Sequence, residues 1–108
     1  MKWLVGLLLM LGLWIAPAPA HAAADGAALF EAHCVGCHLN GGNIIRRGKN
    51  LKLKTLERDG IATVEAIAAI AREGRSQMSG YADVLGTDGD QLVAEWVLIQ
   101  AQNAWTQG

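Results

Sequence analysis

Residues 34–38 read Cys34-Val35-Gly36-Cys37-His38, and this pentapeptide determines most of what the chain can be. A Cys-x-x-Cys-His run is the attachment signature of a c-type haem, in which two thiols add across the two vinyl groups of one porphyrin. The histidine that follows then lies under the iron and can bind it through an imidazole nitrogen. The chain has no other cysteine. The sequence therefore predicts one covalent haem c, bound through Cys34 and Cys37, with His38 as an iron ligand.

Two other uses of a Cys-x-x-Cys pair remain open. A redox-active dithiol needs a strand before the motif and a βαβ setting. The residues that precede Cys34 have a helical pattern instead, and the sequence contains no good strand pattern. A zinc site needs four ligands, and Cys34, Cys37 and one of His33 or His38 leave the fourth to be found. Haem attachment is therefore the favoured interpretation, with the dithiol and the zinc site as alternatives.

The N-terminal residues have the order of a secretory signal peptide. Lys2 is a short positive start, residues 3–16 are an unbroken apolar run, and overlapping Ala-x-Ala matches follow within residues 17–24. The run is shorter than the ~18–20 apolar residues that a membrane-spanning helix needs. We therefore predict a cleaved signal peptide over residues 1–22 and a single domain over residues 23–108. Export would take this domain to the thylakoid lumen or the periplasm, without stable membrane insertion.

The predicted domain is small and slightly acidic. Without Lys2, eight basic residues face ten acidic ones, a net charge of −2. This charge indicates no strongly basic face for nucleic acid. A domain of this size buries little more than ~60% of the surface that its unfolded chain exposes. A covalent haem would supply the missing apolar core.

Apolar spacing on both sides of the motif predicts helices joined by loops. Gly74 stands where a C′ glycine would end a helix, and the glycine-containing segments 39–50 and 74–87 are typical of loops. The predicted inner face of the last helix comprises Leu92, Val93, Trp96, Val97, Gln100 and Ala104. The predicted helices are 25–34 with Asp25 as a cap, 55–59, 63–73, and a last one opened by Thr87. The sequence thus predicts one compact all-α domain.

With this motif and these helices, the chain resembles the class I cytochromes c, and among them the small photosynthetic type called cytochrome c6. Gly26 and Phe30 precede the motif at the family's offsets, and residues 96–100, Trp-Val-Leu-Ile-Gln, are similar to the family's ending. The resemblance implies a class I cytochrome c fold of about four helices around one covalently attached haem. It also implies that Gly26 and Phe30 pack against Val93 and Trp96, because only glycine lets two helix backbones cross so closely.

The resemblance also implies a methionine as the second axial ligand, in the loop before the last helix. Met78 lies there and is the only methionine outside the predicted leader. A lone methionine in a small protein is usually core filler, but the neighbours of Met78 are polar and offer no packing stripe. His33 is a rival nitrogen. It is fixed beside Cys34 on the attachment side, so we expect it to be an exposed helix residue. The predicted iron ligands are His38 and Met78.

Ligation by His38 and Met78 predicts an electron carrier rather than an enzyme, with no catalytic residues. Both axial positions are filled, and a thioether sulfur stabilises Fe(II) and raises the potential. We expect a soluble, monomeric single-electron carrier of a photosynthetic or respiratory chain. It would dock transiently on membrane electron-transfer complexes or soluble redox proteins. The alternatives are a haem-based sensor or peroxidase-like protein with a labile sixth ligand and, less favoured, a non-haem Cys-x-x-Cys redox protein.

A basic stretch follows the haem motif. It is either a solvated face or a docking surface for an acidic partner, steered by charge. Its basic residues are Arg46, Arg47, Lys49, Lys52, Lys54 and Arg58.

Two departures from the cytochrome c6 pattern distinguish this chain. Ile70 stands where the family generally carries a glutamine near the haem, so we expect a lower potential. The family's Met-Pro-Ala-Phe-Gly-Gly-Arg-Leu stretch reads Met-Ser-Gly-Tyr-Ala-Asp-Val-Leu over residues 78–85. Its arginine, thought to serve in docking to the photosystem, is replaced by Val84. Variants of this kind occur in the subgroup often called c6B or c6C, and we expect partners that differ from those of typical cytochrome c6.

Overall fold

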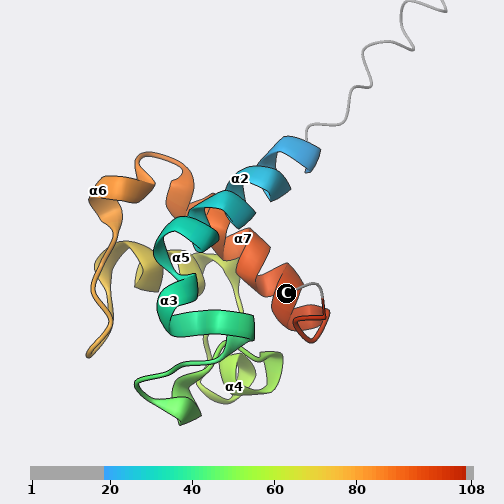
Figure 1. Ribbon diagram of the computed structural model, residues 1–108, viewed down its shortest axis with the longest axis vertical. Coiled ribbons are helices and arrows are strands. Elements are labelled where there is room, and N and C mark those ends of the chain that lie inside the picture. Colours follow the sequence, from blue (N-terminus) through green and yellow to red (C-terminus); the bar gives the residue numbers. More distant parts are fainter. Residues whose placement is uncertain (1–18, 107–108) are drawn as a thin grey trace, which may run out of the picture.

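A computed structural model describes residues 19–106 of the chain, with the backbone alone for residues 19–24. This part is helical, and its only β-type pairing is one isolated bridge between Arg75 and Met78. The helices are α2 (Pro19–His33), α3 (Val35–His38), α4 (Leu53–Arg58), α5 (Val64–Glu73), α6 (Ala82–Leu85) and α7 (Gly89–Gln102), with 3-10 turns η1 (Leu39–Gly41) and η2 (Arg47–Lys49) (Figure 1). None of the described helices is long and apolar enough to cross a membrane. The all-α prediction is confirmed, whereas most of the predicted signal peptide lies outside the described residues.

The frame of the domain is the crossing of α2 and α7, which lie against each other in Figure 1. Gly26 is buried at the crossing. A Cβ atom built on it would lie 2.5 Å from the Leu92 carbonyl oxygen and 2.8 Å from the Trp96 Cβ. Such contacts are too short for any side chain, so glycine is required there. The predicted packing of Gly26 and Phe30 against α7 is confirmed.

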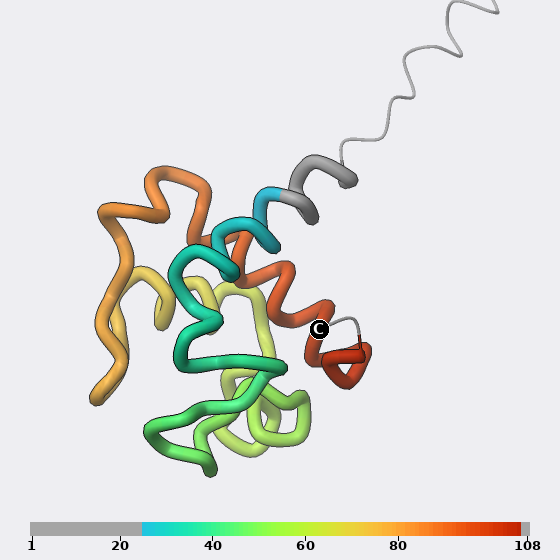
Figure 2. The backbone as a smooth tube through the Cα atoms, in the orientation of Figure 1, coloured from blue at the N-terminus to red at the C-terminus, as the bar shows by residue number. Residues whose placement is uncertain are grey.

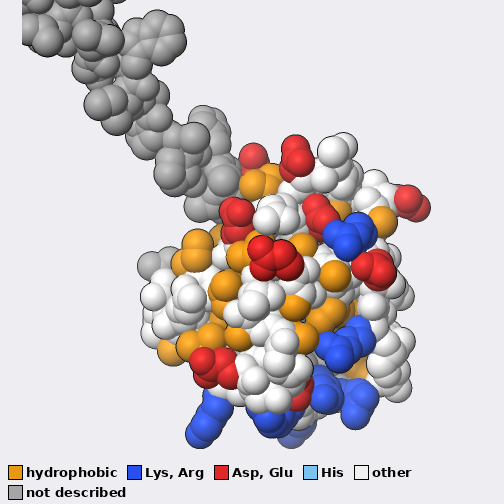
Figure 3. Space-filling model, turned by 180° about the vertical axis from the view of Figure 1, so that it is seen from behind, with side chains coloured by type: hydrophobic (Ala, Val, Ile, Leu, Met, Phe, Trp, Pro, Cys, Tyr) orange, Lys and Arg blue, Asp and Glu red, His pale blue; other side chains and the backbone are white. Residues whose placement is uncertain are grey.

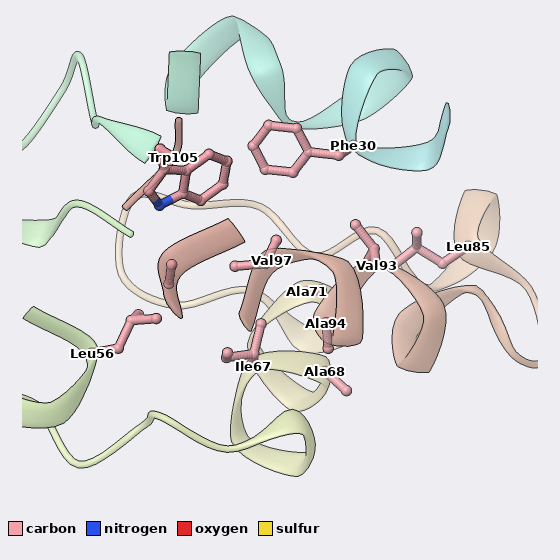
Figure 4. Packing of buried hydrophobic residues seen from close by; sticks show 11 residues of the cluster. Phe30, Leu56, Ile67, Ala68, Ala71, Leu85, Val93, Ala94, Val97 and Trp105 are labelled. Carbon is pink, nitrogen blue, oxygen red and sulfur yellow. The ribbon is translucent and has the colours of Figure 1, made fainter. Parts of the chain in front are cut away.

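Three aromatic rings fill the space beside this crossing. The Phe30 ring centroid lies 4.8 Å from that of Trp96 and 5.6 Å from that of Trp105, and the two tryptophans are 5.7 Å apart. Figure 4 shows Phe30 and Trp105 facing each other at the edge of the apolar core. The Trp105 Nε1 donates a hydrogen bond to the Leu51 carbonyl oxygen at 3.0 Å. This bond joins the end of the chain to the segment that follows the haem motif (Figure 2).

Helix α5 begins and ends as the sequence predicts. The Thr63 side chain caps it by accepting a hydrogen bond from the Ala66 backbone N–H at 3.1 Å. Gly74 follows its last residue with φ of +82°, in the left-handed region that glycine adopts at helix ends. These two ends fix the position of helix α5, which forms one wall of the cavity that His38 and Met78 line.

Three expectations about the other helix ends are wrong. Helix α2 begins at Pro19 rather than at Asp25, because proline suits the first turn of a helix and the alanines that follow extend it. Helix α7 has Asp88 at its N-cap rather than Thr87, because the Asp88 carbonyl accepts the first helical hydrogen bond, from Leu92. Ala104 is exposed because α7 ends at Gln102.

Candidate haem site

A cavity of about 550 Å³ opens between the segment after α2 and the segment from α5 to Tyr81. Its lining includes all four residues predicted from the sequence: Cys34, Cys37, His38 and Met78. Val93 and Val97 of α7 also line it. Cofactor pockets are typically ~300–1,000 Å³ and mostly apolar, so this cavity has the size and character of a cofactor site.

His38 lies at the end of α3 with only 7% of its surface exposed. Its Nδ1 atom is 2.7 Å from the Gly42 carbonyl oxygen. Because a carbonyl can only accept, Nδ1 carries the proton and Nε2 is left with a lone pair for a metal. The sequence alone did not identify this partner, since it is a backbone atom that reaches His38 only when residues 39–42 form a turn.

Cys34 and Cys37 lie on one turn of backbone. The Cys34 carbonyl accepts hydrogen bonds from the N–H groups of Cys37 at 3.2 Å and His38 at 3.0 Å. Cys34 is half-buried and Cys37 is exposed. The turn presents both sulfurs, followed by the imidazole, to a single cavity.

The environment of the two thiols disfavours the alternatives to haem. Burial, with a smaller contribution from Cys37, raises the pKa of Cys34 to about 11. The attacking cysteine of a redox-active dithiol has a lowered pKa. Among the side chains of residues 25–106, no three His, Cys, Asp or Glu are grouped closely enough to hold a metal ion. The arrangement therefore suits thiols that become thioethers better than a dithiol or a zinc site.

Met78 sits at the end of a tight turn between α5 and α6. Its backbone N–H donates to the Arg75 carbonyl at 3.0 Å, and its carbonyl accepts from the Arg75 N–H at 2.9 Å. Ser76 turns the chain with φ of +57°. The Met78 side chain is half-buried and lines the cavity, and it does not belong to the buried apolar cluster of the described residues. Met78 is therefore not core filler.

Helix α5 supplies an apolar wall to the cavity, formed by Ile67, Ile70 and Ala71. Ile70 thus lines the site, as the sequence comparison with cytochrome c6 implied. His33 lines the cavity as well and is half-buried, with its ring centroid 6.2 Å from that of Tyr81. The expectation that His33 is exposed is wrong, because the chain after Met78 folds back and brings Tyr81 beside it.

Polar side chains line another part of the cavity. Arg46 and Lys49 contribute positive charge, and Asn43 and Asn50 contribute amides. The one acidic group is Asp59, and hydrogen bonds from Arg58 and then Lys49, at 3.0 and 3.3 Å, hold its pKa below the usual value. Cations and amides suit the two propionate carboxylates of a haem. Together with the thiols, imidazole, thioether and apolar wall, they make the cavity chemically suited to haem c.

Comparison with known proteins agrees with this chemistry. Residues 21–97 match the family model described as cytochrome c oxidase, cbb3-type, subunit III. A cytochrome c6-like protein of Nostoc sp. is 46% identical over 102 residues, 94% of this chain and 92% of that protein. The solved structure of cytochrome c6B from a Synechococcus species is 71% identical, with a TM-score of 0.76 over 78% of this chain and 96% of that one. Cytochrome c6C from another Synechococcus is 52% identical, with a TM-score of 0.70 over 73% and 96%.

Proposed function

Because the chain belongs to the cytochrome c6 family and binds one covalent haem c through Cys34 and Cys37, we propose that it carries single electrons with His38 and Met78 as axial iron ligands. Like its cytochrome c6 relatives, it is a haem electron carrier and not an enzyme. The observation that carries the ligand proposal is that His38, Met78 and both thiols line one cavity. The haem supplies the one-electron chemistry, and the protein supplies binding, orientation and electrostatics.

His38 provides the fixed ligand. Its hydrogen bond to the Gly42 carbonyl sets the tautomer and holds the ring in one orientation. A histidine ligand whose other nitrogen donates a hydrogen bond is also a more basic ligand. Nε2 is thus directed to the metal before any haem is attached.

Met78 and the apolar side chains of α5 both raise the redox potential of the haem. A thioether ligand favours Fe(II) and raises the potential. The apolar side chains of Ile67, Ile70 and Ala71 keep water from this side of the cavity and lower the local dielectric. Compared with a water-filled site, both effects favour the reduced state, which carries one positive charge fewer. Compared with the glutamine of typical cytochrome c6, Ile70 lacks a hydrogen-bond donor and gives a lower potential.

We also propose that residues 1–22 are a signal peptide that is removed on export to the thylakoid lumen or the periplasm. The charged start, apolar middle and small-residue end of this segment support the proposal. The electron partners would be membrane electron-transfer complexes or soluble redox proteins that dock transiently. Mass spectrometry of the exported protein tests the signal-peptide proposal, because the intact mass gives the cleavage site once the mass of one attached haem is subtracted.

The ligand proposal is tested by Met78→Ala in a host that can attach haem. The oxidised wild-type protein should show a sulfur-to-iron charge-transfer band. The variant should keep its haem, lose the band and lower the midpoint potential by at least about 0.1 V, a fraction of the roughly 0.8 V that axial ligands span. Gln77→Ala, in the same turn and exposed, is the matched control and should change neither property.

A variant with an unchanged band and potential would exclude Met78 as the ligand. The sensor or peroxidase-like alternative is tested on the wild-type protein. Rapid binding of carbon monoxide by the reduced form would favour it, because this requires an open or easily vacated sixth position.

A further inference from the structure

Charge is distributed unevenly around the cavity. Residues 44–59, called here the basic segment, contain six basic and two acidic side chains. Residues 75–90, called here the acidic segment, contain one basic and three acidic side chains. Both segments contribute residues to the cavity lining, but the only charged one from the acidic segment is Arg75, and its three acidic residues lie outside the lining. In the view of Figure 3, Lys and Arg gather at the lower end of the molecule and most Asp and Glu lie above them.

Two apolar side chains project from the basic segment. Ile44 and Ile45 are 68% and 58% exposed, and Ile45 also lines the cavity. Asn43 holds their loop in place: its Oδ1 accepts from the Ile45 N–H at 3.0 Å and the Arg46 N–H at 2.8 Å, and its Nδ2 donates to the Lys49 carbonyl at 3.0 Å. Exposed apolar residues beside a cofactor cavity indicate a contact surface for another molecule. Because the loop is already ordered in the free protein, binding would cost little conformational entropy.

Three cations of the basic segment are available to a partner: Arg47, Lys52 and Lys54. Lys49 and Arg58 are paired with Asp59, and Arg46 lines the cavity, where it suits a haem propionate. No side chain within residues 25–106 forms an ion pair with Arg47, Lys52 or Lys54. On the acidic segment, Val84 is 52% exposed and stands next to Asp83. A partner with an acidic surface would be attracted to the basic segment and repelled by Asp83.

We propose that the basic segment, including its exposed Ile44 and Ile45, docks an acidic redox protein, and that the acidic segment stays outside the contact. The inference rests on the proposed electron-carrier function. Attraction between unlike charges speeds encounter, and its contribution falls as salt screens it. The charge that matters is the local one around the cavity, and its sign is opposite to the net charge of the predicted domain.

Small anionic oxidants test the local charge directly. Hexacyanoferrate(III) takes one electron from the reduced protein and becomes hexacyanoferrate(II), so its rate reports on the electron exit. We expect this rate to fall as ionic strength rises, although the domain carries a net negative charge. Arg47→Gln should lower it about two- to fivefold at low ionic strength, as expected for losing one unit charge near a trianion.

Val84→Glu is the matched control, because it also changes the net charge by −1, at an exposed residue of the acidic segment that does not line the cavity. It should change the rate by less than half as much on a logarithmic scale. A wild-type rate that rises with salt, or equal slowing by both variants, would overturn the proposal. Failure of the electron-carrier function would look different, because the protein would then transfer no electron to hexacyanoferrate(III) at any salt concentration.

A protein reductant tests the contribution of the isoleucines. With a reduced acidic flavodoxin as the probe, which gives one electron to the oxidised protein, Ile44→Ser should slow electron transfer severalfold. It should leave the hexacyanoferrate(III) rate of the reduced protein unchanged, since a small anion needs no apolar contact. Equal rates for wild type and variant with flavodoxin would remove the isoleucines from the docking surface and overturn the proposal. So would salt-sensitive dimerisation lost in Ile44→Ser, because the segment would then bind a second copy of this chain.

Discussion

The loop that follows His38 and the loop that carries Met78 face one cavity, but they are held in different ways. In the first, side chains do much of the holding: His38 bonds to Gly42, Asn43 bonds three backbone groups of its own loop, and Trp105 bonds to Leu51. In the second, residues 74–81, no side chain hydrogen-bonds to any other described residue. Its hydrogen bonds are between backbone groups only.

The backbone bonds within the Met78 loop are the pair between Arg75 and Met78. Its two ends are joined to the neighbouring helices: Gly74 and Tyr81 donate to the carbonyls of Ile70 and Ala71 at 2.7 and 2.9 Å, and the Tyr81 carbonyl accepts from the Leu85 N–H at 2.9 Å. Segments with fewer buried contacts open at lower free-energy cost than the rest of a fold. The two proposed iron ligands are therefore held with different strength. The His38 imidazole is held in place by hydrogen bonds of the fold, and the Met78 thioether is the ligand that would dissociate first.

Trp105→Ala removes a contact that holds the segment after His38, and it should cause the largest loss in the free energy of unfolding. The variant loses a buried ring from the cluster with Phe30 and Trp96, together with the hydrogen bond to Leu51. Removing a buried aromatic side chain costs about 3–5 kcal/mol. Guanidinium unfolding of the holoprotein should show a decrease of this size in the free energy of unfolding.

Tyr81→Ala is the counterpart on the Met78 side. Tyr81 is half-buried and makes no side-chain hydrogen bond to a described residue, so its loss should cost about 1–2 kcal/mol, within the usual range for single substitutions. If the two variants lost the same free energy, the difference between the loops would not be a difference in stability.

Ile70→Gln tests the apolar wall of α5, because it places a hydrogen-bonding amide where the wall has only apolar side chains. An amide N–H directed into the cavity would stabilise the added electron of the reduced state. A hydrogen bond to a charged group is worth about 1.5–3 kcal/mol. Discounting that for partial exposure to about 1–2 kcal/mol gives a rise of about 40–90 mV for a one-electron couple. A redox titration of the purified holoprotein measures it.

Ile70→Leu is the control, because it keeps an apolar side chain of equal volume and should leave the potential unchanged. If Ile70→Gln also left it unchanged, the side chain at this position would not reach the haem. An equal rise in both variants would point to altered packing rather than to the amide.

The features that the sequence predicted are those fixed by local spacing. Cys34, Cys37 and His38 are consecutive on one turn, and Thr63 and Gly74 bound α5 through contacts within a few residues. Patterns of this kind are visible in a single sequence because the interacting groups are neighbours in it.

The features that the sequence did not predict depend on distant segments. Trp105 enters the core through left-handed backbone at residues 104 and 105, a conformation that no local pattern of this chain indicates. The Gly42 carbonyl reaches His38 only through the turn that Asn40 and Gly41 make. His33 became half-buried because Tyr81 covers it. The places of Trp105 and His33 depend on packing between segments that are far apart in the chain, and the bond of His38 depends on an unusual backbone turn that no side-chain pattern marks.

Ser76→Gly tests the weaker loop with the smallest expected effect. Ser76 holds a left-handed φ of +57°, which costs a residue with a Cβ about 1–2 kcal/mol. Glycine avoids that cost but loses about 0.5–1 kcal/mol through its greater freedom in the unfolded chain. The balance predicts a gain of about 0.5–1 kcal/mol in the free energy of unfolding. Tighter closure of this turn should also slow carbon monoxide binding to the reduced protein.

Asn40→Gly is the matched change in the loop that follows His38, where Asn40 has a φ of +53°. Asparagine tolerates left-handed backbone better than serine does, because its short amide can hydrogen-bond locally. The strain to be relieved is therefore smaller, and the entropy cost of glycine should cancel it. We expect no gain in stability and no change in carbon monoxide binding. If Asn40→Gly slowed carbon monoxide binding as much as Ser76→Gly, ligand release would not be controlled by the Met78 loop.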